Sequence, residues 1–227
     1  MSQKELIQSQ FNELKSIYPG LSLSEKNDGI FLIQGMLDFS ATYNEVTIED
    51  IFDIEIVIPV GYPDNLPEVR EIGGRIPRNF HTYSDGTLCL GAQLGIRMKF
   101  IRNPTLNTFV QELIIPYLYS FCHKRIHKTM PYGELSHGGQ GILEFYCELF
   151  NTKSEDVAIG FLRILAGNYR GHQSCPCGSG NKLRDCHGES IRIISTYQDQ
   201  DSFKDDYKQC LEYLVAKTKR SKLLISR

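Results

Sequence analysis

Residues 47–60 read TIEDIFDIEIVIPV. The isoleucines at positions 54, 56 and 58 alternate with Glu55 and Val57, and a period of two residues is typical of a half-buried strand. The preceding run, residues 29–43, is also rich in β-forming residues, and Asn44-Glu45 between the two runs suits a turn. We therefore expect an antiparallel hairpin or meander here.

Helices are predicted on both sides of this hairpin by apolar residues at three- and four-residue spacing. The first covers residues 4–18 and ends at Pro19-Gly20. A strongly apolar helix over residues 106–121 is expected to begin at Asn103-Pro104-Thr105, with the proline in its first turn, and Pro116 should kink or split it. Two more helices are expected over 141–150 and 155–166, and a C-terminal helix follows Asp201-Ser202 as its cap.

The stretch between the hairpin and the apolar helix shows fewer patterns that predict secondary structure. Prolines at positions 63 and 67 end the second run, since they cannot continue a sheet ladder. Residues 68–72 are long enough for one more short strand, and residues 73–95 are glycine-rich and loop-like.

The overall composition is that of an ordinary globular protein. The chain has 227 residues, of which 41% are hydrophobic and 23% charged, and its formal net charge of −2 gives no reason to expect a nucleic-acid partner. It contains no apolar run long enough to span a bilayer, and its N-terminus lacks the apolar core of a signal peptide. We therefore expect a cytoplasmic protein with reduced thiols and no membrane partner.

The most specific motif lies at residues 174–188, which read SCPCGSGNKLRDCHG. Cys175 and Cys177 can place two thiolates on one turn, and Cys186 and His187 supply two further ligands. A closed set of four protein ligands leaves no position for a water molecule, so we expect structural Zn²⁺ rather than a catalytic metal. The segment resembles the SEC-C metal-binding motif. The alternative is a set of unrelated thiols in a glycine-rich loop.

A second candidate is Cys89, within residues 83–90, which read YSDGTLCL. A thiol that follows a glycine-containing loop can be exposed at the mouth of a cleft and act as a nucleophile. The alternative is a small buried core residue, which is what most free cysteines are.

The order of these features resembles the ubiquitin-conjugating (UBC) fold in its bacterial, conjugation-like branch. An N-terminal helix precedes the meander, Tyr62-Pro63 and Pro67 follow it, then come residues 85–90 and an Asn-Pro start to a helix. The resemblance covers about residues 1–150. It implies an α+β fold, in which a UBC-like antiparallel meander sheet packs on helices, with a C-terminal SEC-C zinc knuckle and a terminal helix.

The resemblance also implies a function. Cys89 would accept an activated ubiquitin-like modifier or protein C-terminus as a thioester and pass it to an amine of a target protein. The implied partners are an activating-enzyme-like protein, the modifier and the target. The resemblance further suggests that the protein belongs to a bacterial antiviral defence operon, with a nucleotidyltransferase as one candidate target.

Two further residues become candidates through the resemblance. The family usually carries a His-Pro-Asn tripeptide whose asparagine, eight residues before the cysteine, stabilises the oxyanion. The tripeptide is absent here, and His81 stands at that position. Its imidazole could donate to the oxyanion or act as a base, or it could make only a structural bond. Asp85 could orient or deprotonate the incoming amine, although an aspartate before glycine is also a common turn residue.

The domain organisation follows from these assignments. We expect a conjugating domain over residues 1–150, a helical linker over 151–172, the knuckle over 173–190 and a C-terminal helical segment over 191–227. A non-catalytic UBC/RWD-like adaptor with a zinc-stabilised tail is the main alternative function. A cysteine hydrolase that uses Cys89 and His81 is a weaker one.

Three other sets of residues are assigned to the scaffold. Residues 122–128 read CHKRIHK and are interpreted as the basic C-terminal end of a helix, with a metal or phosphate site as the alternative. Cys147 and Cys210 lie on apolar helix faces and are expected in the core. The glycine-rich residues 137–141 lack the strand and the Lys-Ser/Thr pair of a phosphate loop.

Overall fold

The hairpin predicted from residues 29–60 is the central feature of the structure, a computed structural model that describes residues 2–26, 29–132 and 136–225. Strands β2 (Phe31–Tyr43) and β3 (Val46–Ile58) pair in antiparallel register along their whole length, from Phe31 opposite Ile58 to Tyr43 opposite Val46. The predicted turn residues Asn44 and Glu45 both have positive φ, 46° and 65°. Two such residues in a row form the tight turn whose twist matches that of paired strands.

Two short strands complete an antiparallel sheet in the order β1-β2-β3-β4. Strand β4 (Glu68–Glu71) matches the short strand predicted after the prolines. Strand β1 (Leu21–Glu25) was not predicted, because its five residues include only two apolar side chains. Its extended conformation is stabilised by pairing with residues 31–35 of β2.

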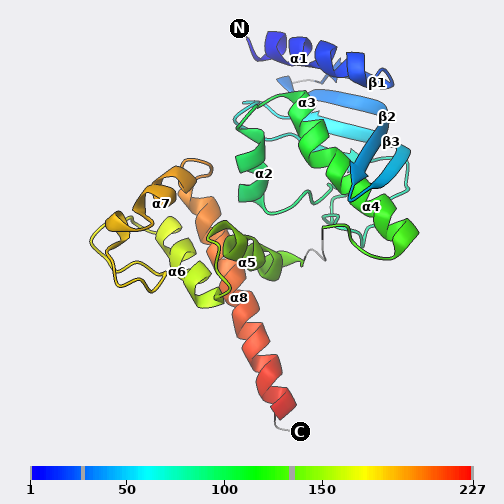
Figure 1. Cartoon of the computed structure of the whole chain (residues 1–227). Coiled ribbons are helices and arrows are strands. Elements are labelled where there is room, and N and C mark those ends of the chain that lie inside the picture. Colours follow the sequence, from blue (N-terminus) through cyan, green and yellow to red (C-terminus); the bar gives the residue numbers. More distant parts are fainter. Residues whose placement is uncertain (1, 27–28, 133–135, 226–227) are drawn as a thin grey trace. The chain divides into compact units, whose positions relative to one another are not determined.

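Helices cover one face of this sheet (Figure 1). Helix α1 (Gln3–Ile17) begins at a capping box in which Ser2 and Glu5 each bond the other's backbone N–H. The apolar helix is formed by α3 (Leu106–Phe109), a π-helical turn η2 (Val110–Ile114) and α4 (Ile115–His127) in direct succession. The predicted helices at residues 4–18 and 106–121 are confirmed.

Two details of the apolar helix differ from the prediction. Its N-cap is Thr105, whose hydroxyl accepts from the Thr108 N–H, so Pro104 precedes the cap and does not lie in the first turn. The helix also continues through Pro116. The π-helical turn comes just before it, and the Ile115 N–H bonds the carbonyl of Val110, five residues back. This wider turn displaces the carbonyl that a proline ring would otherwise meet, so the helix need not break.

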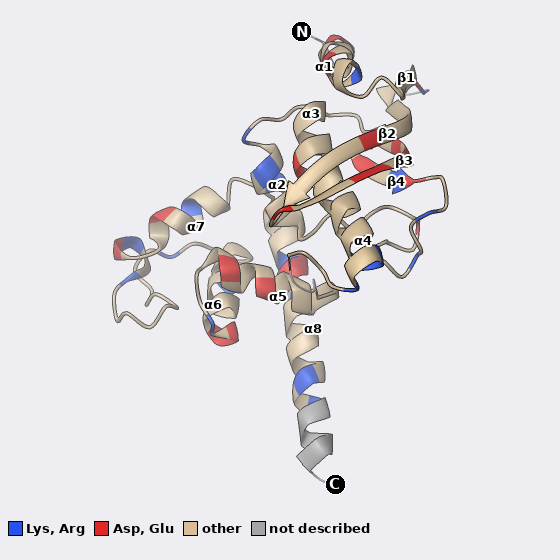
Figure 2. Cartoon of the chain, turned by 45° about the vertical axis from the view of Figure 1, so that its right-hand side comes forward, with Lys and Arg blue, Asp and Glu red and all other residues tan. Residues whose placement is uncertain are grey.

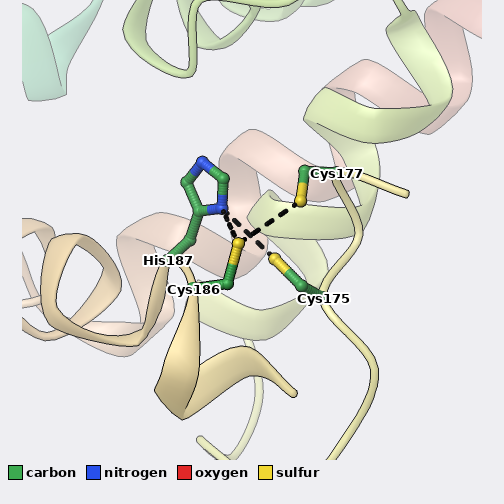
Figure 3. A group of neighbouring side chains, drawn as sticks. All are labelled: Cys175, Cys177, Cys186 and His187. Atoms are coloured by element: carbon green, nitrogen blue, oxygen red, sulfur yellow. Dashed lines mark hydrogen bonds between the residues drawn. The ribbon is translucent and has the colours of Figure 1, made fainter. Parts of the chain in front are cut away.

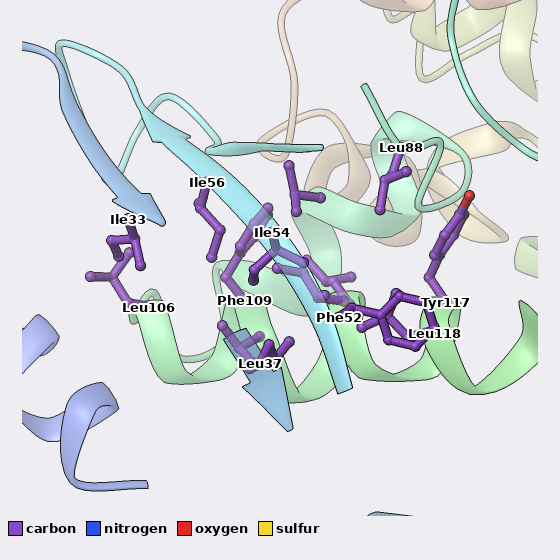
Figure 4. Packing of buried hydrophobic residues seen from close by; sticks show 14 of the residues in the cluster. Ile33, Leu37, Phe52, Ile54, Ile56, Leu88, Leu106, Phe109, Tyr117 and Leu118 are labelled. Carbon is purple, nitrogen blue, oxygen red and sulfur yellow. The ribbon is translucent and has the colours of Figure 1, made fainter. Parts of the chain in front are cut away.

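The core of the first unit lies between the sheet and these helices. Figure 4 shows β2 and β3 side chains such as Ile33, Phe52 and Ile54 facing Leu106, Phe109 and Leu118 of the helix. All six are buried.

The opposite face of the sheet is polar. Three cross-strand pairs on it join side chains by hydrogen bonds, Gln34 to Glu55, Ser40 to Glu49 and Thr42 to Thr47. Acidic residues lie along β2 and β3, whereas α4 carries lysine and arginine near its C-terminal end (Figure 2). The sheet therefore has the alternation of a layer with one buried and one solvated face.

A second compact unit contains the rest of the chain. The contacts divide the molecule into Met1–Gly91 with Ile96–Glu134, and Ala92–Gly95 with Leu135–Arg227. Helix α2 (Gln93–Phe100), in a stretch with no helix signal, includes residues of both units. Helix α5, which the sequence analysis placed in the first domain, falls in the second unit. The predicted boundaries at residues 150, 172 and 190 stay predictions.

The second unit is helical. It comprises α5 (Gly138–Leu149), α6 (Glu155–Leu165), the 3₁₀ turn η3 (Leu183–Asp185), α7 (Gly188–Ile194) and α8 (Gln200–Ile225). The predicted helices at 141–150 and 155–166 and the C-terminal helix are confirmed, but Asp199 caps α8 in place of Asp201-Ser202, its carboxylate accepting from the Ser202 N–H at 2.7 Å. None of the helices in the described residues is long and apolar enough to cross a membrane.

Candidate functional site

The backbone of residues 173–188 forms a tight loop that brings its two ends together. The Cys175 N–H donates to the carbonyl of Asn181 at 2.9 Å, and the Leu183 N–H donates to the carbonyl of Gln173 at 2.8 Å. Between them Gly178 and Gly180 have φ of +78° and +77°, a left-handed conformation that side chains disfavour. The glycines noted in the sequence therefore serve to reverse the chain.

The four predicted ligands converge in this loop (Figure 3). Their ligand atoms all lie within 4.8 Å of one another. The Nδ1 atom of His187 is 3.3 Å from the sulfur of Cys175 and 3.2 Å from that of Cys186, and the sulfurs of Cys177 and Cys186 are 3.6 Å apart. Metal–ligand bonds of about 2.0–2.3 Å at tetrahedral angles require edges of roughly 3.5–3.8 Å. The donor set and its spacing are thus compatible with a metal ion such as zinc.

Cys186 and His187 are neighbours in sequence, yet both side chains reach the same point. Cys186 has unusual backbone angles, φ −133° and ψ −91°, immediately after η3. His187 then occupies the N-cap position of α7. This change of direction between a 3₁₀ turn and a helix meets the geometric requirement that adjacent ligands impose.

The loop is packed against α6 of the same unit. A Cβ atom at Gly160 would lie 2.8 Å from the Cβ of Pro176, so the two backbones approach closely. The imidazole of His187 lies against the ring of Phe161, with centroids 4.8 Å apart, and Leu183 is fully buried. Apolar contacts therefore anchor the loop on the helical unit, and one of them is made by the candidate ligand His187.

The thiols differ in their environment. Burial raises the pKa of Cys175 to about 11. A hydrogen bond from the Ser179 hydroxyl lowers the pKa of Cys177 to about 6. Because metals bind thiolates, metal binding at neutral pH would release a proton from Cys175, whereas Cys177 is already largely a thiolate.

The SEC-C motif matches residues 173–189 of this chain. The match coincides with the cluster of Cys175, Cys177, Cys186 and His187, so the predicted motif is confirmed, and its four residues form a cluster that could hold a metal ion. No curated protein matches the chain.

In the first unit, Cys89 ends a small hairpin. The Tyr83 N–H donates to the carbonyl of Thr87, Thr82 lies opposite Leu88, and the Cys89 N–H donates to the carbonyl of His81 at 2.7 Å. In this register His81 is the residue directly opposite Cys89. Cys89 is partly exposed. The hairpin therefore places the backbones of the candidate nucleophile and the candidate histidine opposite each other.

The conformation of His81 is unusual. Its φ is +40°, a region that few residues other than glycine adopt, and its side chain is 91% buried. The imidazole meets the ring of Phe80 edge-on, with centroids 5.2 Å apart. This positive φ departs from the extended conformation of a regular ladder.

Tyr117 of α4 holds this hairpin in place, and sequence analysis gave it no role. Its hydroxyl donates to the carbonyls of Phe80 at 2.8 Å and His81 at 3.2 Å. Burial, above all, and the nearby Cys89 thiol raise the pKa of Tyr117. Its position on the apolar helix concealed it, because an apolar stripe predicts only that such a tyrosine is core.

Asp85 lies at the other end of the hairpin. Its carboxylate accepts from the backbone N–H and the hydroxyl of Thr87, both at 3.0 Å, and its Oδ2 lies 3.5 Å from the Arg70 guanidinium. The hydrogen bonds with Thr87 lower its pKa. Two residue pairs, about 7 Å of strand, separate this turn from the His81–Cys89 pair. Asp85 thus stabilises the turn, and its catalytic role stays a prediction.

The remaining cysteines lie in the scaffold. Cys122 and Cys210 are fully buried, whereas Cys147, which was expected in the core, is only partly buried. The Cys122 thiol donates to Asp50, and burial raises its pKa to about 12. Asp50 also binds the guanidinium of Arg75 at 2.7 Å and that of Arg125 at 3.1 Å. Sequence analysis missed this cluster, because Arg75 and Arg125 lie 25 and 75 residues from Asp50 and no local pattern links them.

Proposed function

We propose that this protein is a ubiquitin-conjugating-like transferase whose nucleophile is Cys89. The observation that carries the proposal is the placement of Cys89 at the open end of a hairpin, partly exposed and directly opposite a strained histidine. Strained non-glycine residues are enriched at functional sites. The four-stranded antiparallel meander, with the Cys89 hairpin following it and the apolar helix behind, agrees with the fold that the resemblance implies.

The proposed chemistry uses few groups. The thiolate of Cys89 attacks the activated carbonyl of a modifier or protein C-terminus, and the activating enzyme's leaving group departs. A target amine then attacks the thioester, and the thiolate leaves. The tetrahedral oxyanion needs a donor within hydrogen-bond reach, and the imidazole of His81 is the candidate on this hairpin.

We further propose that the SEC-C cluster holds one structural Zn²⁺. A zinc ion with four protein ligands joins distant parts of a loop and supplies folding free energy without an open position for substrate. Cys175, Cys177, Cys186 and His187 would hold it. In this proposal the helical unit is an accessory that contacts a partner or the target, and the protein works in the reducing cytoplasm.

The partners follow from the proposed chemistry. They are an activating-enzyme-like protein, a ubiquitin-like modifier or activated protein C-terminus, and a target with an accessible amine, for which a nucleotidyltransferase of an antiviral defence operon is one candidate.

The decisive experiment is adduct formation. The chain is incubated with ATP and the activating enzyme and modifier encoded beside its gene, and the products are separated with and without reducing agent. A reductant-sensitive adduct is expected on the wild type and on Cys147→Ala, but not on Cys89→Ala. If no adduct forms with these neighbouring proteins, or if Cys89→Ala still forms it, the transferase proposal is wrong.

A second candidate function is a non-catalytic adaptor. The observation that favours it is the use of Asp85 within its own turn, together with the missing His-Pro-Asn tripeptide. Brief labelling of the native protein with a maleimide, followed by peptide mapping, separates the two. Fast modification at Cys89, faster than at Cys147, contradicts the adaptor, whereas an inert Cys89 supports it.

A further inference from the structure

The C-terminal turn of α4 carries two histidines at positions i and i+4. The rings of His123 and His127 lie next to each other, with centroids 4.5 Å apart and planes inclined by 43°. Residues four apart face the same side of a helix. The two imidazoles therefore lie side by side on one face of the helix end.

The orientation of His123 is fixed by the backbone. Its Nδ1 is 2.8 Å from the carbonyl oxygen of Thr129, and since a carbonyl can only accept, Nδ1 carries the proton. The other nitrogen, Nε2, is then the one with an available lone pair. A histidine that ligates a metal commonly donates its second N–H to a carbonyl in this way. On its other side, His123 lies 6.0 Å from the ring of Tyr119, centroid to centroid.

The ring separation fits two ligands on a single ion. With metal–nitrogen bonds of about 2.1 Å, two imidazoles at right angles around one ion have centroids about 4.6 Å apart. The same rings at a tetrahedral angle would be about 5.3 Å apart. The observed separation of 4.5 Å matches the right-angled arrangement, which Ni²⁺ and Cu²⁺ adopt.

The surrounding charges do not oppose a cation as strongly as the sequence suggests. Arg125 binds Asp50 at 3.1 Å, and the ammonium of Lys124 lies 5.9 Å from the centre of the Phe80 ring. Both side chains thus have partners elsewhere on the unit, and the ammonium of Lys128, next to His127, donates to the carbonyl of Arg125 at 2.9 Å. The last turn of a helix also presents the negative end of its dipole, which favours a cation at this place.

We propose that His123 and His127 form a second metal site, separate from the cysteine cluster, for a divalent transition metal of the Ni²⁺ or Cu²⁺ type. The two imidazoles supply neighbouring ligands, and water fills the other positions. This proposal does not depend on the transferase function.

Calorimetric titration with Ni²⁺ tests it on the full chain, after the cysteine cluster has been saturated with zinc. We expect one Ni²⁺ per chain, with binding lost in His123→Asn and in His127→Asn. The variant His172→Asn, which changes an exposed histidine elsewhere, should bind like the wild type. A thermal unfolding transition like that of the wild type confirms that each variant is folded. Free zinc is followed with a colorimetric indicator during the titration.

Three results would overturn the proposal. If only one of the two single variants loses binding, the ion is not chelated. If His172→Asn also loses it, the ion binds at His172, and if zinc is released as Ni²⁺ binds, the ion has gone to the cysteine cluster. Paramagnetic broadening by Ni²⁺ should be strongest at residues 119–129, and broadening centred on residues 173–189 would contradict the site.

Discussion

Removal of one metal ligand should loosen the SEC-C loop and leave the sheet unchanged. The perturbation is Cys186→Ser, chosen because Cys186 is the exposed cysteine of the ligand set, so the substitution itself has little effect on packing. With three ligands left, zinc affinity should fall far enough for the metal to be lost on dialysis.

The magnitude follows from the loop that the metal closes. The first and last ligands, Cys175 and His187, are separated by twelve residues. The chain-entropy estimate for a cross-link over about 13 residues is about 3 kcal/mol, with the metal in place of a disulfide. A free-energy change of that size raises the population of the opened loop about a hundredfold.

Amide hydrogen exchange measures this opening directly. The amides of Cys175 and Leu183, both hydrogen-bonded inside the loop, should exchange about a hundredfold faster in the variant. Amides of the β2–β3 ladder should keep their rates, and Cys147→Ser, which changes a cysteine outside the cluster, should match the wild type at all sites. Unchanged exchange in a zinc-free variant would refute the claim that the metal stabilises the loop, and equal acceleration in the sheet would refute its confinement to the second unit.

Three further predictions concern stability. Hydrogen bonds from Arg75, above all, hold the pKa of Asp50 well below its ordinary 3.8, so Asp50→Asn should cost about 2 kcal/mol in urea unfolding at neutral pH. That cost should disappear as the pH falls below 3.8 toward the folded-state pKa, and a cost that persists in acid would contradict the pairing. Burial raises the pKa of Asp206. The contribution of Asp206 to stability is therefore present below pH 3.8 and is lost as the pH rises through the raised pKa. Asp206→Asn should flatten this decline in the unfolding free energy, and a slope equal to that of the wild type would count against the prediction. Tyr117→Phe should lower the unfolding free energy by about 1–2 kcal/mol and speed maleimide labelling of Cys89; unaltered labelling would mean that the hydroxyl does not hold the hairpin.

Much of the scaffold follows from the sequence, because its signals are local. The alternation at 54, 56 and 58 predicts the central strand, and the apolar spacing of residues 4–18 predicts α1. The cluster of four candidate metal ligands is predicted equally well, since all four residues lie within one short loop whose spacing is itself the signal.

Features that depend on distant partners were not predicted. Strand β1 has little apolar character of its own and exists through its pairing with β2. Tyr117 reaches the Cys89 hairpin across 36 residues of sequence, and Asp50 meets Arg125 across 75. Such contacts are set by tertiary packing, which no local pattern encodes. The alignment of His81 opposite Cys89 likewise appears only when the hairpin register is known.

The π-helical turn before Pro116 has a consequence for insertions and deletions. A π-helical turn holds one residue more than an α-helical turn, and here it lies on the stretch where a proline would otherwise clash with its own helix. The extra residue and the proline are therefore expected to be gained or lost together in related sequences. A relative with alanine in place of Pro116 should be one residue shorter between Leu106 and Tyr117, and its tyrosine should still reach the same two carbonyls. An alignment that forces equal lengths there would misplace every later residue of α4 by one position.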